Sequence, residues 1–150
     1  MSIIRNIDLT LETIVSLSNL IVEAETVEPF EELIPIPSDN KDRVLPDFIK
    51  TGMIFKVKSI LKNTSDNFIP ALIRVPNENW RRRFSHHKER YANGVSKSFT
   101  VNKYISKVSS IKEAKILFLN CYSDDFSLTA HNAYELQDSL QKVIEMINNQ

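Results

Sequence analysis

Side chains able to contact phosphates and bases are concentrated in residues 76–94, which read PNENWRRRFSHHKERYANG. Arginine and lysine bind phosphate oxygens, and an aromatic ring or a guanidinium plane stacks on an unpaired base. Asn77 can cap a helix and Gly94 can end one, so the sequence predicts a helix over about residues 78–91. Together these features predict a nucleic-acid interface on a basic helix inserted into the fold.

The aromatic residues of this segment form one stripe of the expected helix. Trp80, Phe84, His87 and Tyr91 are separated by 4, 3 and 4 positions. A stripe of this kind is typical of a helix side that packs into the core. Three consecutive arginines cover about 200° of the helix circumference, so they cannot all meet one flat partner. The alternative interpretation is therefore a packed stripe whose basic remainder is solvated or pairs with acidic residues elsewhere.

Charge is unevenly distributed along a chain whose 19 basic and 19 acidic residues cancel. Residues 1–47 hold 3 basic and 10 acidic side chains, residues 48–120 hold 15 and 4, and residues 121–150 hold 1 and 5. The basic middle favours a surface for a polyanion, but acidic and basic segments that packed together would cancel. The residues predicted to bind nucleic acid are Arg81, Arg82, Arg83, Lys88, Arg90, Lys56 and Lys58. Residues that would widen this surface are Lys62, Arg74, Lys97, Lys103 and Lys107.

Side chains for acid–base or metal chemistry are few. The candidates are His86, His87, His131, Asp124 and Asp125. They could form the centre of a small metal-dependent hydrolase, but adjacent histidines point to different sides of a helix and no metal-binding histidine spacing occurs. The single cysteine, Cys121, lies in an apolar run, where a thiol usually serves packing rather than nucleophilic catalysis. We therefore assign no catalytic residue and no metal ligand.

Several classes of protein are disfavoured by composition. The two glycines, Gly52 and Gly94, are too few for a glycine-rich phosphate loop or a dinucleotide fingerprint, so no cofactor is expected. One cysteine cannot form an intramolecular disulfide, which favours a reducing compartment and a cytoplasmic location. No apolar stretch approaches about 18 residues and no signal-like segment opens the chain, so neither a membrane span nor secretion is expected.

The expected fold is α+β, with residues 1–150 forming a single domain around an antiparallel sheet of about four to five strands. The sheet would be built from residues 52–122. Alternating apolar residues predict a hairpin with strands near 53–61 and 68–75. The nearly continuous apolar run at 115–122 predicts a buried central strand.

Two helices are expected to flank this sheet. Apolar residues at helical spacing predict one helix over about residues 11–26 and another over about residues 130–147, with Thr129 as a cap for the second. Residues 27–50 contain four prolines and several glutamates. They are expected to form a Pro-rich, acidic, extended connection.

Three classes of function are compatible with the sequence. The first is a small non-catalytic module that binds nucleic acid and has a regulatory role. The second is a protein-interaction module, such as an inhibitor, adaptor or assembly factor, that docks through its basic helix or an acidic arm. The third is the hydrolase. A related hypothesis is that residues 27–47 mask the basic surface until a partner displaces them. The acidic arm consists of Glu23, Glu25, Glu28, Glu31 and Glu32.

Overall fold

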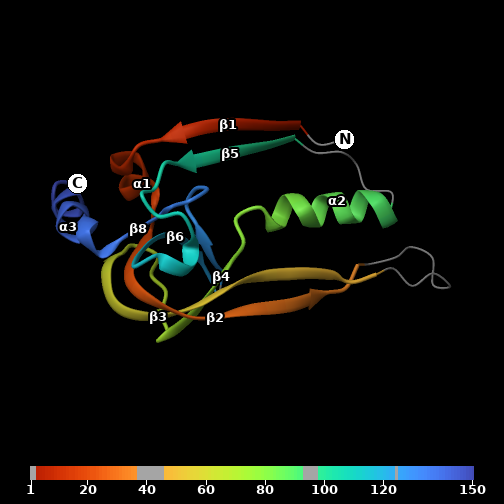
Figure 1. Cartoon of the computed structure of the whole chain (residues 1–150), viewed down its shortest axis with the longest axis horizontal. Helices are drawn as coiled ribbons and strands as arrows, with labels where there is room; N and C mark the ends of the chain where they lie inside the picture. The colour runs from red at the N-terminus through yellow and green to blue at the C-terminus, as the bar shows by residue number, and fades with distance from the viewer. Residues whose placement is uncertain (1–2, 37–45, 93–97, 124) are drawn as a thin grey trace.

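The computed structural model describes residues 3–36, 46–92, 98–123 and 125–150. They form one domain of helices and mostly antiparallel strands (Figure 1). The elements in chain order are β1 (Ile3–Leu9), α1 (Leu11–Leu17), β2 (Leu20–Ile34), β3 (Phe48–Asn63), β4 (Leu72–Pro76), α2 (Trp80–Ala92), β5 (Ser98–Tyr104), η1 (Ile111–Glu113), β6 (Ile116–Tyr122), β7 (Asp125–Leu128), β8 (Tyr134–Glu135), η2 (Gln137–Ser139) and α3 (Leu140–Asn148).

The main sheet has six antiparallel strands. Five follow the order β4-β3-β2-β6-β7, and β8 pairs with β6 beside β7. The two strands at the ends of this path, β4 and β7, contact each other, so the sheet curls back toward itself. β1 and β5 form a separate parallel pair, which Figure 1 shows running beside each other above α2. The α+β class is thus confirmed in outline. The sheet is larger than expected because β2, β7 and β8 join it from outside residues 52–122, whereas β5 pairs with β1 instead.

The curled sheet has an apolar core on each face. Its inner face is lined by residues from all five strands of the path: Leu20, Val22, Ala24, Met53, Phe55, Ile73, Val75, Leu117, Leu119, Cys121 and Phe126. Its outer face carries Ile21, Ile116 and Phe118, which α1 and α3 cover with Ile14 and Val143. Alternate residues of β2 and β6 therefore enter different cores, as strand geometry requires.

The N-terminal helix is much shorter than predicted. Thr10 caps α1 by accepting a hydrogen bond from the backbone N–H of Thr13, and α1 ends at Leu17. The helix ends before Ser18, whose backbone is extended and whose hydroxyl and N–H both donate to the carbonyl of Ile14. The following residues form β2 because Leu20 to Val22 are buried on both faces of the sheet.

The prediction that residues 27–50 form an extended connection was also wrong, because paired strands continue into both ends of this segment. Residues 27–34 extend β2 and residues 48–50 begin β3, and the two strands pair as far as Ile34 and Phe48. Residues 37–45 lie outside the described part of the chain. The prolines did not prevent strand formation. Pro29 lies in β2 opposite Met53, where β2 is paired with β3 alone among the described strands.

The C-terminal helix starts later than predicted. Residues 130–136 contain a turn, with Asn132 at a φ of 64°, followed by β8. The Phe118 N–H donates to the carbonyl of Ala133, which attaches this segment to β6. Thr129 does not cap a helix, because its hydroxyl bonds to that of Ser18. The helical spacing of the apolar residues therefore described α3 correctly only from Leu140 onward.

Gly52 allows β3, β4 and β2 to approach one another closely. A Cβ atom at this position would meet the Val75 carbonyl oxygen, with the Phe30 ring and Pro76 Cα each at 2.6 Å. Two of these three contacts involve backbone atoms that cannot turn aside. The approach also fixes Phe30, whose side chain is buried against this point.

We predict that Gly52→Ala destabilises the fold by about 1–3 kcal/mol through this overlap. Urea unfolding followed by circular dichroism would measure the change. Lys56→Ala on the same strand is the matched control, because Lys56 is exposed and should shift stability by less than about 0.5 kcal/mol. Equal stability of Gly52→Ala and the native chain would contradict the packing described.

A buried carboxylate joins β8 to the end of β5. Glu135 is only 3% exposed, and its side chain accepts hydrogen bonds from the Tyr104 hydroxyl and from the Lys107 N–H. Burial, and then the hydrogen bond to Glu135, raises the pKa of Tyr104. Because the pKa in the folded chain exceeds the unfolded value of about 10, this stabilisation is complete below that pH and declines as pH rises toward the folded pKa.

Tyr104→Phe should therefore destabilise the native state by about 1–3 kcal/mol at neutral pH, since Glu135 loses a donor inside the protein. The difference between this variant and the native chain should shrink when pH is raised from about 8 to about 11. Urea titrations at both pH values would measure it. A difference that stayed constant with pH would show that Tyr104 ionises as it does in the unfolded chain.

Candidate functional site

The aromatic stripe of α2 packs on the ribbon formed by the far ends of β2 and β3. Ring centroids are 5.2 Å apart for Phe48 and Phe84, 5.7 Å for Phe48 and His87, and 6.2 Å for Trp80 and Phe84. Figure 1 shows α2 lying along this ribbon. Trp80, Phe84 and His87 thus have the packing role given by the alternative sequence interpretation, whereas the side chain of Tyr91 lies outside the described part of the structure.

Two aromatic rings beside the start of α2 carry cations. The Lys50 Nζ lies 4.1 Å and the Arg81 Cζ 5.0 Å from the centroid of the Trp80 ring. The Arg74 Cζ lies 5.3 Å from the centroid of the Phe30 ring. Each cation–π contact stabilises by about 0.5–1 kcal/mol at an exposed site and leaves the charge itself in place.

We call Lys50, Arg74, Arg81, Arg82 and Arg83 the basic cluster. Within the part of the chain that the structure describes, none of these five side chains forms an ion pair with a carboxylate. Arg81 and Arg83 are exposed, and Arg82 is half-buried. The first turn of α2 also contains no acidic residue, although a helix N-terminus favours negative side chains.

The other predicted nucleic-acid residues are not all part of this cluster. Lys88 and Arg90 belong to α2, but their side chains lie outside the described part of the structure. Lys56 is exposed on β3. Lys58 forms an ion pair with Glu25. Lys62 donates to the carbonyl of Val15 at 2.8 Å, and burial lowers the pKa of its amine. Lys58 and Lys62 therefore both bind groups of the protein itself.

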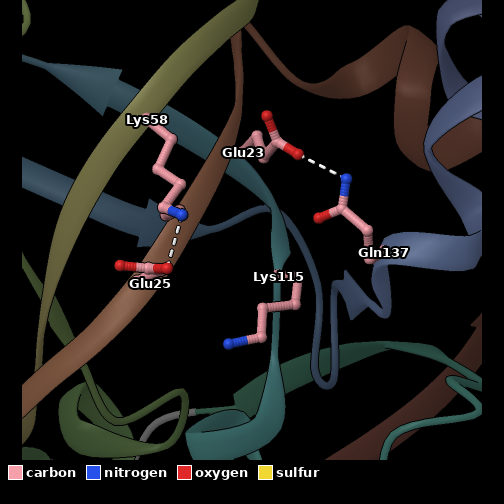
Figure 2. A pocket seen from close by; sticks show the side chains of 6 residues that line it. Glu23, Glu25, Lys58, Lys115 and Gln137 are labelled. Atoms are coloured by element: carbon pink, nitrogen blue, oxygen red, sulfur yellow. Dashed lines mark hydrogen bonds and ion pairs between the residues drawn. The ribbon is translucent and has the colours of Figure 1, made fainter.

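A second polar site surrounds the Lys58–Glu25 pair. It is a pocket of about 390 Å³ lined by Glu23, Ala24, Glu25, Lys58, Lys115 and Gln137. Figure 2 shows Gln137 reaching Glu23 from one side, while the amines of Lys58 and Lys115 lie on the side of Glu25. The pocket lies at the end of the pairing between β2 and β6, where Glu23 is opposite Ile116 and the Ala24 N–H donates to the Lys115 carbonyl at 2.9 Å.

A bulge in β3 shapes this pocket. Glu23 pairs with Ser59 but Ala24 pairs with Val57, so Lys58 is an additional residue without a cross-strand partner. Ser59 Oγ donates to Glu23 Oε1 at 3.1 Å, while Lys58 contacts Glu25. Two successive residues of β3 thus face the same side, which regular strand alternation does not allow.

The charges of the pocket are only partly paired. Glu23 accepts from Ser59 at one oxygen and from Gln137 Nε2 at the other, at 2.5 Å. The hydrogen bond from Lys58 lowers the pKa of Glu25, and Glu25 in turn raises the pKa of Lys58. The half-buried Lys115 has no ion pair or side-chain hydrogen bond among the described residues.

The candidates for catalysis are separated in the fold. His131 Nε2 lies 3.0 Å from Glu78 Oε2, an oxygen that also accepts from the Asn132 N–H. Asp125 is exposed on β7. Cys121 is 1% exposed in the inner core, in keeping with a packing role. No group of three potential metal ligands is present among the described residues. Asp124 lies outside the described part.

Sequence reasoning missed the residues that depend on tertiary placement. The predicted connection over residues 27–50 includes Lys50, so the contact of Lys50 with the Trp80 ring was not anticipated. Gln137 and Lys115 had no signal, because the pocket exists only after β2, β3 and η2 come together. Residues 48–52 read FIKTG and show no strict alternation of apolar and polar residues, so the sequence carries no strong signal for extending the predicted strand backward.

Comparisons of the chain with protein-family models, with curated proteins and with solved structures find no match. None of the described helices has the length and apolar character needed to cross a membrane.

Proposed function

We propose that the protein is a small non-catalytic module that binds nucleic acid through the basic cluster at the start of α2. The observation that carries the proposal is that the five cations of the basic cluster, three of which lie over the Trp80 and Phe30 rings, lack ion-pair partners in the described structure. A phosphate backbone would supply the missing anions and release condensed counterions.

The local energetics of α2 support this proposal. Three arginines in its first turn repel the positive end of the helix dipole, and no acidic side chain there compensates. Such an arrangement lowers helix stability. A segment that departs from local stability rules without an internal compensation is a candidate for function. Lys58 is the contrasting case, since Glu25 neutralises it within the fold.

The position of the cluster also limits how nucleic acid would bind. Glu32 lies opposite Lys50 on the ribbon, and Glu28 lies opposite Ile54. These carboxylates border the cluster on the β2 side and would repel phosphates there. The expected contact therefore runs from Arg74 along the exposed side of α2 and uses backbone phosphates more than base edges.

Replacing Arg82 and Arg83 together with glutamine should weaken binding and reduce the salt dependence by about two in the slope of log affinity against log salt. These two side chains do not stack on Trp80, so the indole environment should remain unchanged. Fluorescence anisotropy with labelled single- and double-stranded oligonucleotides at about 50 and about 200 mM salt would measure both effects.

The matched control for this experiment is Lys112→Gln combined with Lys142→Gln. Both lysines are exposed, lie on η1 and α3, and give the same change in net charge. The control should bind as the native chain does. Absence of binding at about 50 mM salt, or an equal loss in the control, would count against the basic cluster as the binding surface.

A second candidate function is protein interaction through the β2–β3 ribbon. Leu33 and Ile49 are cross-strand neighbours, and they are 63% and 48% exposed. Glu31 lies two residues before Leu33 on β2, so strand alternation places both side chains on the same face. Exposed apolar side chains bordered by charge are typical of a docking surface, and the acidic border favours a basic partner.

The ribbon candidate predicts that a partner captured by the native chain is lost when Leu33→Ser and Ile49→Ser are combined. Burial of two aliphatic side chains at an interface makes a loss of about tenfold or more in affinity the expected result. Ile60→Ser is the matched control, because Ile60 lies on β3 and is also 48% exposed. Retention by the double variant, or loss by the control, would rule out this face.

A further inference from the structure

The pocket where β2 leaves β6 offers two polar groups that the fold does not satisfy. The Lys115 ammonium has no acceptor among the described residues. Glu25 uses its Oε1 for Lys58, whereas its second oxygen has no described donor. Glu23 is different, because both of its oxygens already accept hydrogen bonds. One positive and one negative group therefore remain available to a ligand.

The overall charge of the pocket restricts the ligand further. Two glutamates and two lysines line it, so the formal charge of the lining is zero. A simple anion would approach Lys115 but meet two carboxylates, and a simple cation would meet two ammonium groups. A molecule that is neutral overall but carries both charges avoids either repulsion and pairs with both unsatisfied groups.

The geometry points to a binding site for a small zwitterion, a molecule with one carboxylate and one ammonium group such as a free amino acid. Its carboxylate would pair with Lys115 and its ammonium group with the second oxygen of Glu25. The volume of about 390 Å³ lies within the usual range for small-molecule pockets, about 300–1,000 Å³. The proposal is independent of nucleic-acid binding, since no residue of the basic cluster lines the pocket.

The bulge at Lys58 gives independent support. Bulges redirect side chains and occur preferentially beside functional sites. Here the extra residue turns Lys58 and Ser59 to the same side, where each engages one of the two glutamates. Each carboxylate thereby has a partner on β3, which restricts its conformations and lowers the entropy that the site loses when a ligand binds.

The test is NMR titration of the native chain with four probes: L-alanine, γ-aminobutyrate, propionate and ethylamine. The two amino acids carry both charges at different spacings, and the other two probes carry one charge each. We expect at least one amino acid to shift the backbone signals of Glu25, Lys115 and Gln137. Neither single-charge probe should do so at the same concentration. Shifts of equal size with propionate or ethylamine, or none with either amino acid, would overturn the proposal.

Substitution of Lys115 provides the second part of the test. Lys115→Met should weaken binding of the amino acid by about tenfold or more, because the ligand carboxylate loses its charged partner. Lys115→Arg keeps the charge and should retain binding, which separates a ligand role from a structural one. Lys112→Met is the matched control, since Lys112 is exposed and does not line the pocket. Unchanged affinity in Lys115→Met would overturn the assignment of Lys115.

Discussion

The antiparallel pairing of β2 with β3 is the interaction on which the other features of the structure depend. Its first half closes the curled sheet over the inner core, and beyond the residues that pair with β6 and β4 it continues as a two-stranded ribbon, residues 31–34 against residues 48–51. A two-stranded ribbon alone is marginally stable in water. α2 provides the missing layer through the contact of Phe84 with Phe48. The position of α2, and of the basic cluster on it, therefore follows from the ribbon.

The same pairing determines which charges remain available. β2 carries the acidic arm and β3 carries four lysines, so the two oppositely charged segments of the sequence lie side by side. Glu25 neutralises Lys58 in this way. Arg81, Arg82 and Arg83 of α2 belong to another layer and have no carboxylate partner among the described residues. Charge counted along the sequence thus overstates the basic surface of β3 and describes that of α2 more accurately.

Local signals in the sequence predicted local structure well. The β3–β4 hairpin and the buried strand β6 both depend on neighbouring residues, and both are present. The errors arose where distant segments decide the outcome. Apolar residues between Leu20 and Val22 fit a helix face as well as a strand buried on both sides. Only the pairing with β3 and β6 selects the strand.

The residues of the candidate sites also differ in whether local sequence signals reveal them. The arginines of α2 were found because they are consecutive in the sequence. Lys50 and Arg74 contribute to the basic cluster only through the tertiary positions of Trp80 and Phe30. The pocket was not predicted, since no spacing in the sequence indicates that a strand will contain an additional residue. A bulge is visible only in the register of two paired strands.

The pairing of β3 also explains why one strand can serve two separate surfaces. Lys50, Lys56 and Lys58 follow one alternation of the strand, and Lys56 is the cross-strand partner of Glu25. The extra residue at Lys58 lets both Lys58 and Ser59 reach glutamates of β2, so this end of the row forms a wall of the pocket. Lys50 lies on the far side of Gly52, where its ammonium group contacts the Trp80 ring of α2. The glutamates of β2 therefore engage the lysine at one end of the row, whereas α2 engages the lysine at the other end.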